Sequence, residues 1–68
     1  MHNRHYLEMV ADAASIERGG VVLEIGPGEG ALTSVLLERG ANVVALEKEA
    51  RLIGLLREKF AGETYEVI

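Results

Sequence analysis

The sequence alternates three apolar runs, rich in strand-forming residues, with three segments of helical periodicity. The helical segments cover residues 4–15, 31–39 and 49–60, and the apolar runs cover residues 21–25, 42–46 and 64–68. Strands joined through helices of this length run parallel, because the chain must cross back to the same end of the sheet, and such crossovers are right-handed. The pattern predicts an α/β chain, one half of a doubly wound fold, without a domain boundary in residues 1–68.

We expect a three-stranded parallel sheet in the order 3-2-1, with flanking helices on both faces. The near-continuous apolar runs are typical of strands that are buried on both sides. In this strand order the first strand, Val21–Ile25, has no partner on its outer edge. An apolar unpaired edge tends to recruit another chain. We therefore predict a homo-oligomer or a strand-exchanged assembly through the Val21–Ile25 edge.

Charge and composition exclude several classes of function. Seven Lys and Arg residues against eleven Asp and Glu give a net charge of -4, whereas proteins that bind nucleic acid through their own surface are usually basic. The chain has no Cys, and its two His residues do not make a metal site, so no metal is expected. Without an apolar run near about 18 residues we expect no membrane contact. The polar first residues argue against a signal peptide, so a cytoplasmic location is expected.

Three glycines, Gly26, Gly28 and Gly30, follow the first predicted strand and lead into a helix. Glycine allows a sharp turn and a close approach of backbone to a ligand, and a helix N-terminus offers free N–H groups. This arrangement is typical of sites for nucleotide-like cofactors. Glu47 ends the next strand, 21 residues after Gly26, which is near the spacing at which an acid reaches ribose hydroxyls.

Two cofactor classes compete for such a loop. With Ala31 in the last position, the loop satisfies the dinucleotide fingerprint. Glu24 followed by alternating glycines instead fits the acid-x-Gly-x-Gly-x-Gly pattern of proteins that bind S-adenosylmethionine (SAM). A carboxylate beside the loop repels a pyrophosphate and attracts the sulfonium and ammonium groups of SAM. Glu24 and Glu29 therefore favour SAM, while a dinucleotide and a purely structural glycine turn stay open as alternatives.

Residues 21–33, Val-Val-Leu-Glu-Ile-Gly-Pro-Gly-Glu-Gly-Ala-Leu-Thr, resemble motif I of the ribosomal RNA adenine N6,N6-dimethyltransferases. The Pro between the first two glycines and the Leu-Thr pair after them narrow this resemblance beyond a generic SAM enzyme. Residues 37–41 and 43–48 continue it, and residues 6–16 are similar to the family's first helix. The resemblance implies a partial Rossmann-like methyltransferase fold and SAM-dependent methylation of an RNA adenine at N6, with the RNA bound outside this segment.

The resemblance also implies a cofactor-binding set of six residues: Glu24, Gly26, Gly28, Gly30, Glu47 and Lys48. The first glycine would contact the methionine part of SAM through its backbone, and the other two would shape the loop. The acid after the second strand would bind both ribose hydroxyls, the lysine beside it would line the adenine, and the acid before the loop would lie near the methionine amino group.

No residue matches the family's catalytic Asn or its stacking Tyr, so the resemblance implies no catalytic residue here, and we expect the isolated chain to be inactive. Three interpretations stay open. The chain is a segment of an RNA adenine N6-methyltransferase, a SAM-binding segment of another class I methyltransferase that transfers nothing alone, or a purely structural piece.

Overall fold

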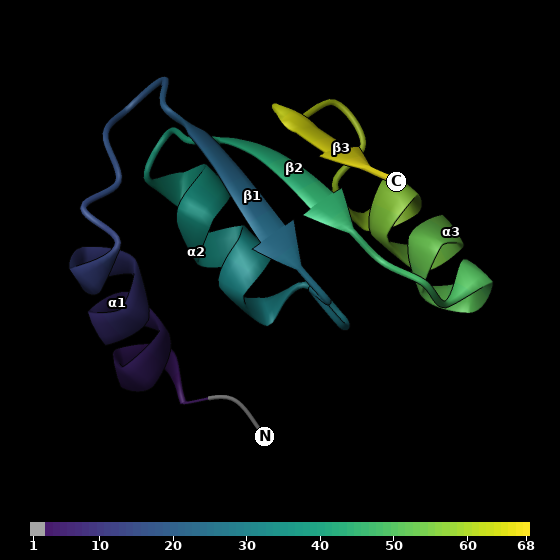
Figure 1. Ribbon diagram of the computed structural model, residues 1–68, viewed down its shortest axis with the longest axis horizontal. Helices are drawn as coiled ribbons and strands as arrows, with labels where there is room; N and C mark the ends of the chain where they lie inside the picture. The colour runs from purple at the N-terminus through teal and green to yellow at the C-terminus, as the bar shows by residue number, and fades with distance from the viewer. Residues whose placement is uncertain (1–2) are drawn as a thin grey trace.

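The computed structural model describes residues 3–68, in which three helices alternate with three strands (Figure 1). The elements are α1 (Arg4–Ala13), β1 (Val21–Ile25), α2 (Ala31–Glu38), β2 (Asn42–Leu46), α3 (Ala50–Lys59) and β3 (Tyr65–Val67). The strands form one parallel sheet in the order β1-β2-β3, which is the predicted order 3-2-1 read from the other edge. The predicted α/β class is confirmed, with the first two strands at the predicted bounds and each helix slightly shorter than expected.

Local sequence signals explain where the helices begin and end. The Asn3 side chain accepts a hydrogen bond from the backbone N–H of Tyr6 at 3.2 Å, which caps the start of α1. Leu7 and Ala11 lie one helical turn apart on α1 and are both buried. After α2, Gly40 takes a φ of +84°, the left-handed conformation that commonly ends a helix.

All three helices pack on one face of the sheet, so the prediction of helices on both faces is wrong. The buried apolar side chains form two clusters on this face: Leu7, Ala11, Val35, Leu36, Ala41 and Val43, and then Ala45, Leu56, Phe60 and Val67. Figure 1 shows β1 in front of α2, with α1 to the left of the sheet. The physical reason is that both right-handed crossovers step along the sheet in the same direction, from β1 to β2 to β3, which puts both connecting helices on the same side.

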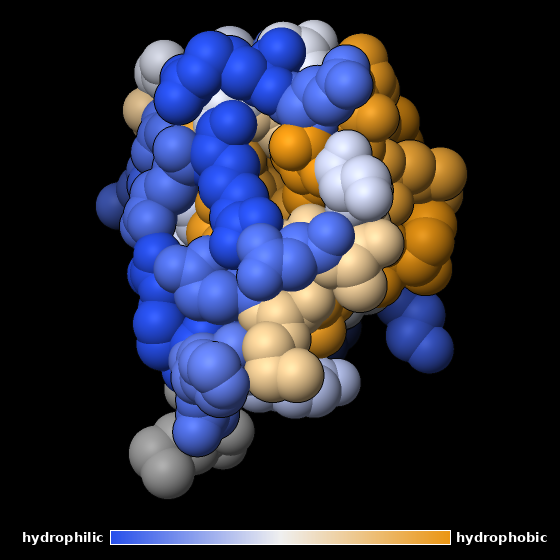
Figure 2. All heavy atoms as spheres, turned by 90° about the vertical axis from the view of Figure 1, so that its left-hand side faces the viewer, coloured by the Kyte–Doolittle hydropathy of each residue, from blue (hydrophilic) through white to orange (hydrophobic). Residues whose placement is uncertain are grey.

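The opposite face of the sheet is apolar and bare. Val21, Leu23 and Ile25 of β1 are 76%, 60% and 68% exposed. Leu46, which pairs with Ile25 in the register, is exposed too, as is Ile68 after β3. Figure 2 shows hydrophobic side chains gathered along one side of the molecule, away from the hydrophilic surface of the helices. The prediction that the first strand is buried on both sides is therefore wrong for the residues that the structure describes.

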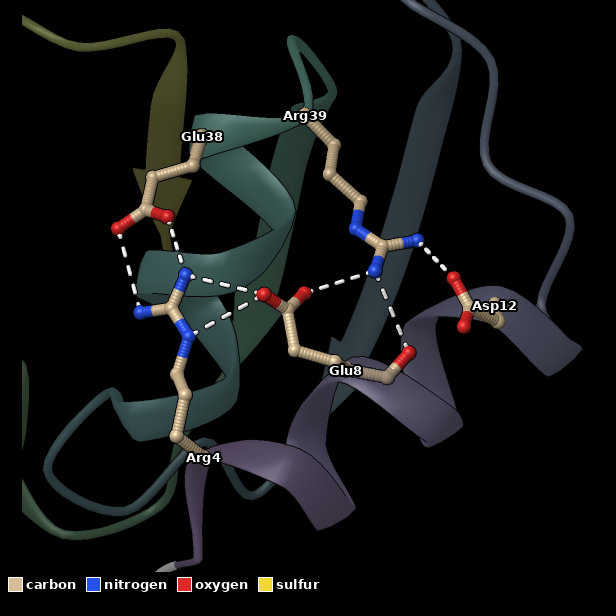
Figure 3. Close-up of polar contacts among 5 residues, drawn as sticks. All are labelled: Arg4, Glu8, Asp12, Glu38 and Arg39. Atoms are coloured by element: carbon tan, nitrogen blue, oxygen red, sulfur yellow. Dashed lines mark hydrogen bonds and ion pairs between the residues drawn. The ribbon is translucent and has the colours of Figure 1, made fainter.

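A network of charged side chains joins α1 to α2 (Figure 3). The Arg39 guanidinium donates to Glu8 and to Asp12, both at 2.7 Å, and Arg4 pairs with Glu8 and Glu38. The Arg39 hydrogen bond lowers the pKa of Glu8. Exposed pairs of this kind contribute little individually, but a shared network fixes how two helices lie against each other. Of the helices in residues 3–68, none has the length and apolar character needed to cross a bilayer.

Candidate functional site

A pocket of about 550 Å³ opens at the carboxyl ends of β1 and β2. Its lining residues are Ile25, Gly26, Leu46, Glu47, Lys48 and Ile68. Ligands of open parallel α/β sheets bind beyond the carboxyl ends of the strands. The volume lies in the range of small-molecule sites, and an apolar wall with a few polar groups is the usual composition of such sites. This pocket is the candidate functional site.

The glycine loop that borders the pocket depends on left-handed backbone conformations. Gly26 and Gly28 have φ values of +63° and +61°, and a Cβ built on either would meet nothing within 4 Å. These two positions therefore need glycine for its backbone freedom, and the space beside them is open. The N–H of Gly26 donates to the carbonyl of Leu46 at 2.9 Å, which fixes the start of the loop against the end of β2.

The last glycine of the loop is needed for packing instead. A Cβ on Gly30 would lie 2.6 Å from the ring atom Cε2 of Phe60, and its φ is +91°. Phe60 follows α3, so the absence of a side chain at Gly30 lets the end of α3 approach the loop. Lys59 adds a hydrogen bond from its Nζ to the carbonyl of Glu29 at 2.8 Å. Gly30 thus packs against the end of α3 and does not line the pocket.

Glu47 is half-buried at the rim of the pocket, one residue after β2. Its Oε2 accepts a hydrogen bond from the backbone N–H of Glu49 at 3.0 Å. Glu49 is the residue that precedes α3, so this bond fixes the carboxylate at the start of that helix. Lys48, beside it, is exposed and also lines the pocket.

Glu24 points to the other side of the sheet. Its side chain is only 8% exposed, and the hydroxyl of Thr33 donates a hydrogen bond to its Oε1. Burial raises the pKa of the Glu24 carboxyl, and the hydrogen bond from Thr33 partly offsets this by favouring the charged form. Because successive strand residues face opposite sides, Glu24 lies behind the sheet while Ile25 lines the pocket.

Glu24 borders a second, smaller hollow of about 230 Å³ beside β1, α1 and α2. Its walls are otherwise apolar, from α1, the segment after it, β1 and α2: Val10, Ala14, Ile16, Val22, Leu23, Ile25, Leu32 and Leu36. An apolar wall explains why burial dominates the pKa of this carboxyl.

The structure brings three of the six predicted cofactor residues together at the main pocket: Gly26, Glu47 and Lys48. The other three do not line it: Glu24, Gly28 and Gly30. The sequence-based prediction did not include the apolar wall formed by Ile25, Leu46 and Ile68. Each of these residues ends a predicted strand, and that position alone indicates the edge of the sheet where ligands bind. The prediction also missed the partnership of Thr33 with Glu24, which nothing in the spacing of the two residues indicates.

Two acidic side chains near the end of the sheet, Glu24 and Glu47, act on the buried hydroxyl of Tyr65. Tyr65 lies on the helix side of β3, with its ring 4.9 Å from that of Phe60, and its hydroxyl has no hydrogen-bond partner in the part of the chain that the structure describes. Burial raises the pKa of Tyr65 most, and the charges of Glu24 and Glu47 raise it further. Glu24 and Glu47 therefore place two acidic groups near the end of the sheet, and Lys48 adds a positive charge to the pocket lining. Residues 3–68 hold no cluster of three or more acidic or His side chains that could bind a metal ion.

Comparison with known proteins gives a consistent result. The family model of the ribosomal RNA adenine dimethylases matches residues 1–68. A chloroplastic ribosomal RNA small subunit methyltransferase of Arabidopsis thaliana is 47% identical over 62 residues, which cover 91% of this chain and 18% of that protein. The crystal structure of the 23S rRNA methyltransferase ErmE superposes with a TM-score of 0.89 at 38% identity, over 100% of this chain and 28% of that one.

A third similar protein was solved with ligands bound. It is a Burkholderia thailandensis 1,6-didemethyltoxoflavin-N1-methyltransferase in complex with 1,6-didemethyltoxoflavin and S-adenosylhomocysteine, with a TM-score of 0.63 and 27% identity over 91% of this chain and 27% of that one. The present chain spans about a fifth of the length of the curated relatives it matches.

Proposed function

This chain belongs to the ribosomal RNA adenine dimethylase family, and from that premise we propose that its main pocket binds SAM for methyl transfer to N6 of an RNA adenine. One observation carries the proposal. Gly26 and Glu47, 21 residues apart in the chain, lie at the rim of one pocket, at the carboxyl ends of two hydrogen-bonded strands. The relative solved with S-adenosylhomocysteine, the demethylated form of SAM, supports the same cofactor class.

The residues of the pocket fit such a cofactor. The open space beside Gly26 admits a ligand to within contact of the backbone. The Glu47 carboxylate is suited to accept hydrogen bonds from two neighbouring ribose hydroxyls, and the apolar wall provides packing for a purine ring. When bound, SAM supplies a methyl group on a positively charged sulfur. The acidic side chains around the loop favour that charge, with Glu24 acting from behind the sheet.

RNA binding and catalysis are proposed to depend on residues outside this chain. The net charge of -4 gives little attraction for a phosphate backbone. No residue of the chain is proposed as catalytic, and its own contribution is to bind and orient the cofactor. A cytoplasmic location stays a prediction, as does the absence of activity in the isolated chain.

Calorimetric titration with S-adenosylhomocysteine tests the proposal. Glu47→Ala should weaken binding by about 1–3 kcal/mol, the size expected for hydrogen bonds to a charged group. The matched control is Glu63→Ala, which removes an exposed acid from the turn before β3, at the opposite end of the sheet. Equal affinities for Glu47→Ala and the unmodified chain would remove Glu47 from the site. Binding of a nicotinamide dinucleotide with no binding of the sulfur nucleoside would support the alternative cofactor class.

We also propose that a second copy of the chain pairs with β1. One edge of β1 is hydrogen-bonded to β2, and no strand covers the other edge among residues 3–68. The side chains of Val21, Leu23 and Ile25 on this strand are mostly exposed. An apolar strand with an open edge is a template for pairing with another chain. Self-association that depends on β1 is the measurable consequence.

A further inference from the structure

The base of the glycine loop is closed by one buried hydrogen bond, between the Thr33 hydroxyl and the Glu24 carboxylate. We infer that Thr33 is a positioning residue of the cofactor site: by binding Glu24 behind the sheet, it holds the glycine loop in the shape that admits the ligand. The inference rests on the proposed function and deepens it. It assigns a role to a side chain that does not line the pocket.

The position of the bond in the chain supports this role. Glu24 is the fourth residue of the five-residue strand β1, and Thr33 lies in the first turn of α2. Every residue of the loop lies between these two partners. Thr33 is 0% exposed and Glu24 is 8% exposed, so both partners of the bond are buried. A buried hydrogen bond to a charged group is among the stronger polar contacts in a protein.

Three further elements restrain single residues of the loop: β2, α3 and, through the Ser34 hydroxyl that donates to the Gly30 carbonyl at 3.1 Å, α2 itself. The Gly26 N–H is bound by the carbonyl of Leu46 on β2, and Lys59 on α3 donates to the carbonyl of Glu29. The Thr33–Glu24 bond instead joins β1 to α2, the two elements that the loop connects. A loop with several left-handed glycines has high conformational freedom, so fixing its two ends together restricts its conformations.

A role in positioning Glu24 can be told apart from a role in packing alone, because only the first affects the charge of Glu24. Tyr65 on β3 is the titratable side chain whose pKa responds to Glu24, while the hollow beside Glu24 is otherwise lined by apolar side chains from α1, α2 and the segments around them. Thr33 therefore supplies the hydrogen bond that favours the charged form of Glu24. Removing the hydroxyl should raise the pKa of Glu24 further, so that the carboxyl takes up its proton at a higher pH.

Titration of the full chain with S-adenosylhomocysteine over a range of pH tests the inference. Thr33→Val, which keeps the shape without the hydroxyl, should weaken binding about tenfold and move the acid limb of the affinity profile to higher pH. Thr33→Ser should restore most of the affinity. The control is Thr64→Val, which removes the Thr64 hydrogen bond to the Ala41 carbonyl (2.8 Å) at the other end of the sheet. Equal affinities and equal acid limbs for Thr33→Val and Thr64→Val would overturn the inference.

Amide hydrogen exchange in the ligand-free chain gives a second, independent readout. The N–H groups of Gly26 and Gly30 are hydrogen-bonded to backbone carbonyls, and that of Asn42 is bonded at the opposite end of the sheet. In Thr33→Val, exchange should accelerate at the two glycines more than at Asn42, and Thr64→Val should not show this pattern. Uniform acceleration would overturn the inference even if the unmodified chain bound no ligand, and that absence of binding would by itself overturn only the proposed function.

Discussion

The two faces of the sheet use similar residues in opposite ways. On β2, Val43 and Ala45 face the helices and are at most 1% exposed, whereas on β1, Val21, Leu23 and Ile25 face the other way and are at least 60% exposed. The covered face contains the core and the Thr33–Glu24 bond that closes the loop. The bare face contributes the apolar wall of the main pocket. The covered face therefore holds the fold together, while the bare face leaves room for a ligand. Apolar composition alone does not distinguish the two faces.

The largest expected effect contrasts one leucine from the covered side with one from the bare face. Leu56→Ala removes a side chain that is 0% exposed, and it should lower the free energy of unfolding by about 2–5 kcal/mol. Leu23→Ala changes a side chain that is 60% exposed, and it should cost less than about 0.5 kcal/mol. Denaturant unfolding at low protein concentration measures both. Similar losses would mean that the bare face is covered in solution.

Self-association provides the next contrast. Sedimentation equilibrium should detect association of the unmodified chain, and Leu23→Lys should weaken it about tenfold because a charge on an edge strand opposes pairing. Leu55→Lys is the matched control, since Leu55 is 42% exposed but lies on α3. A chain that stays monomeric over a wide concentration range would contradict the proposed pairing through β1, and so would equal effects of the two substitutions.

The smallest expected effect concerns the buried carboxylate. Burial raises the pKa of Glu24 in the folded chain, so the folded state binds a proton more readily than the unfolded state. The contribution of Glu24 to stability therefore falls as the pH rises from the ordinary range of a glutamate through the raised pKa, and the cost is fully present above it. Glu24→Gln, which keeps the size and an acceptor oxygen, should raise the unfolding midpoint at neutral pH. The gain should vanish at pH values below both pKa values; a gain independent of pH would contradict this account.

Much of the architecture could be predicted from local patterns. The bounds of β1 and β2, the order of the strands and the turn at Gly26 and Gly28 all agree with the sequence-based predictions. These features depend on neighbouring residues: continuous apolar runs for strands, helical periodicity for helices, and glycines where the backbone turns sharply. The family resemblance was likewise carried by a contiguous motif, and it is confirmed.

The sequence by itself determined the elements, the parallel sheet and the loop, because these follow from local periodicity and backbone sterics. Only the tertiary structure decided which face the helices cover and therefore where each acid lies. Glu24 and Glu47 both lie at strand ends, yet one is buried against Thr33 and the other lines the pocket. Alternation along a strand decides on which face a side chain lies, but the direction of the crossovers decides which of the two faces the helices bury.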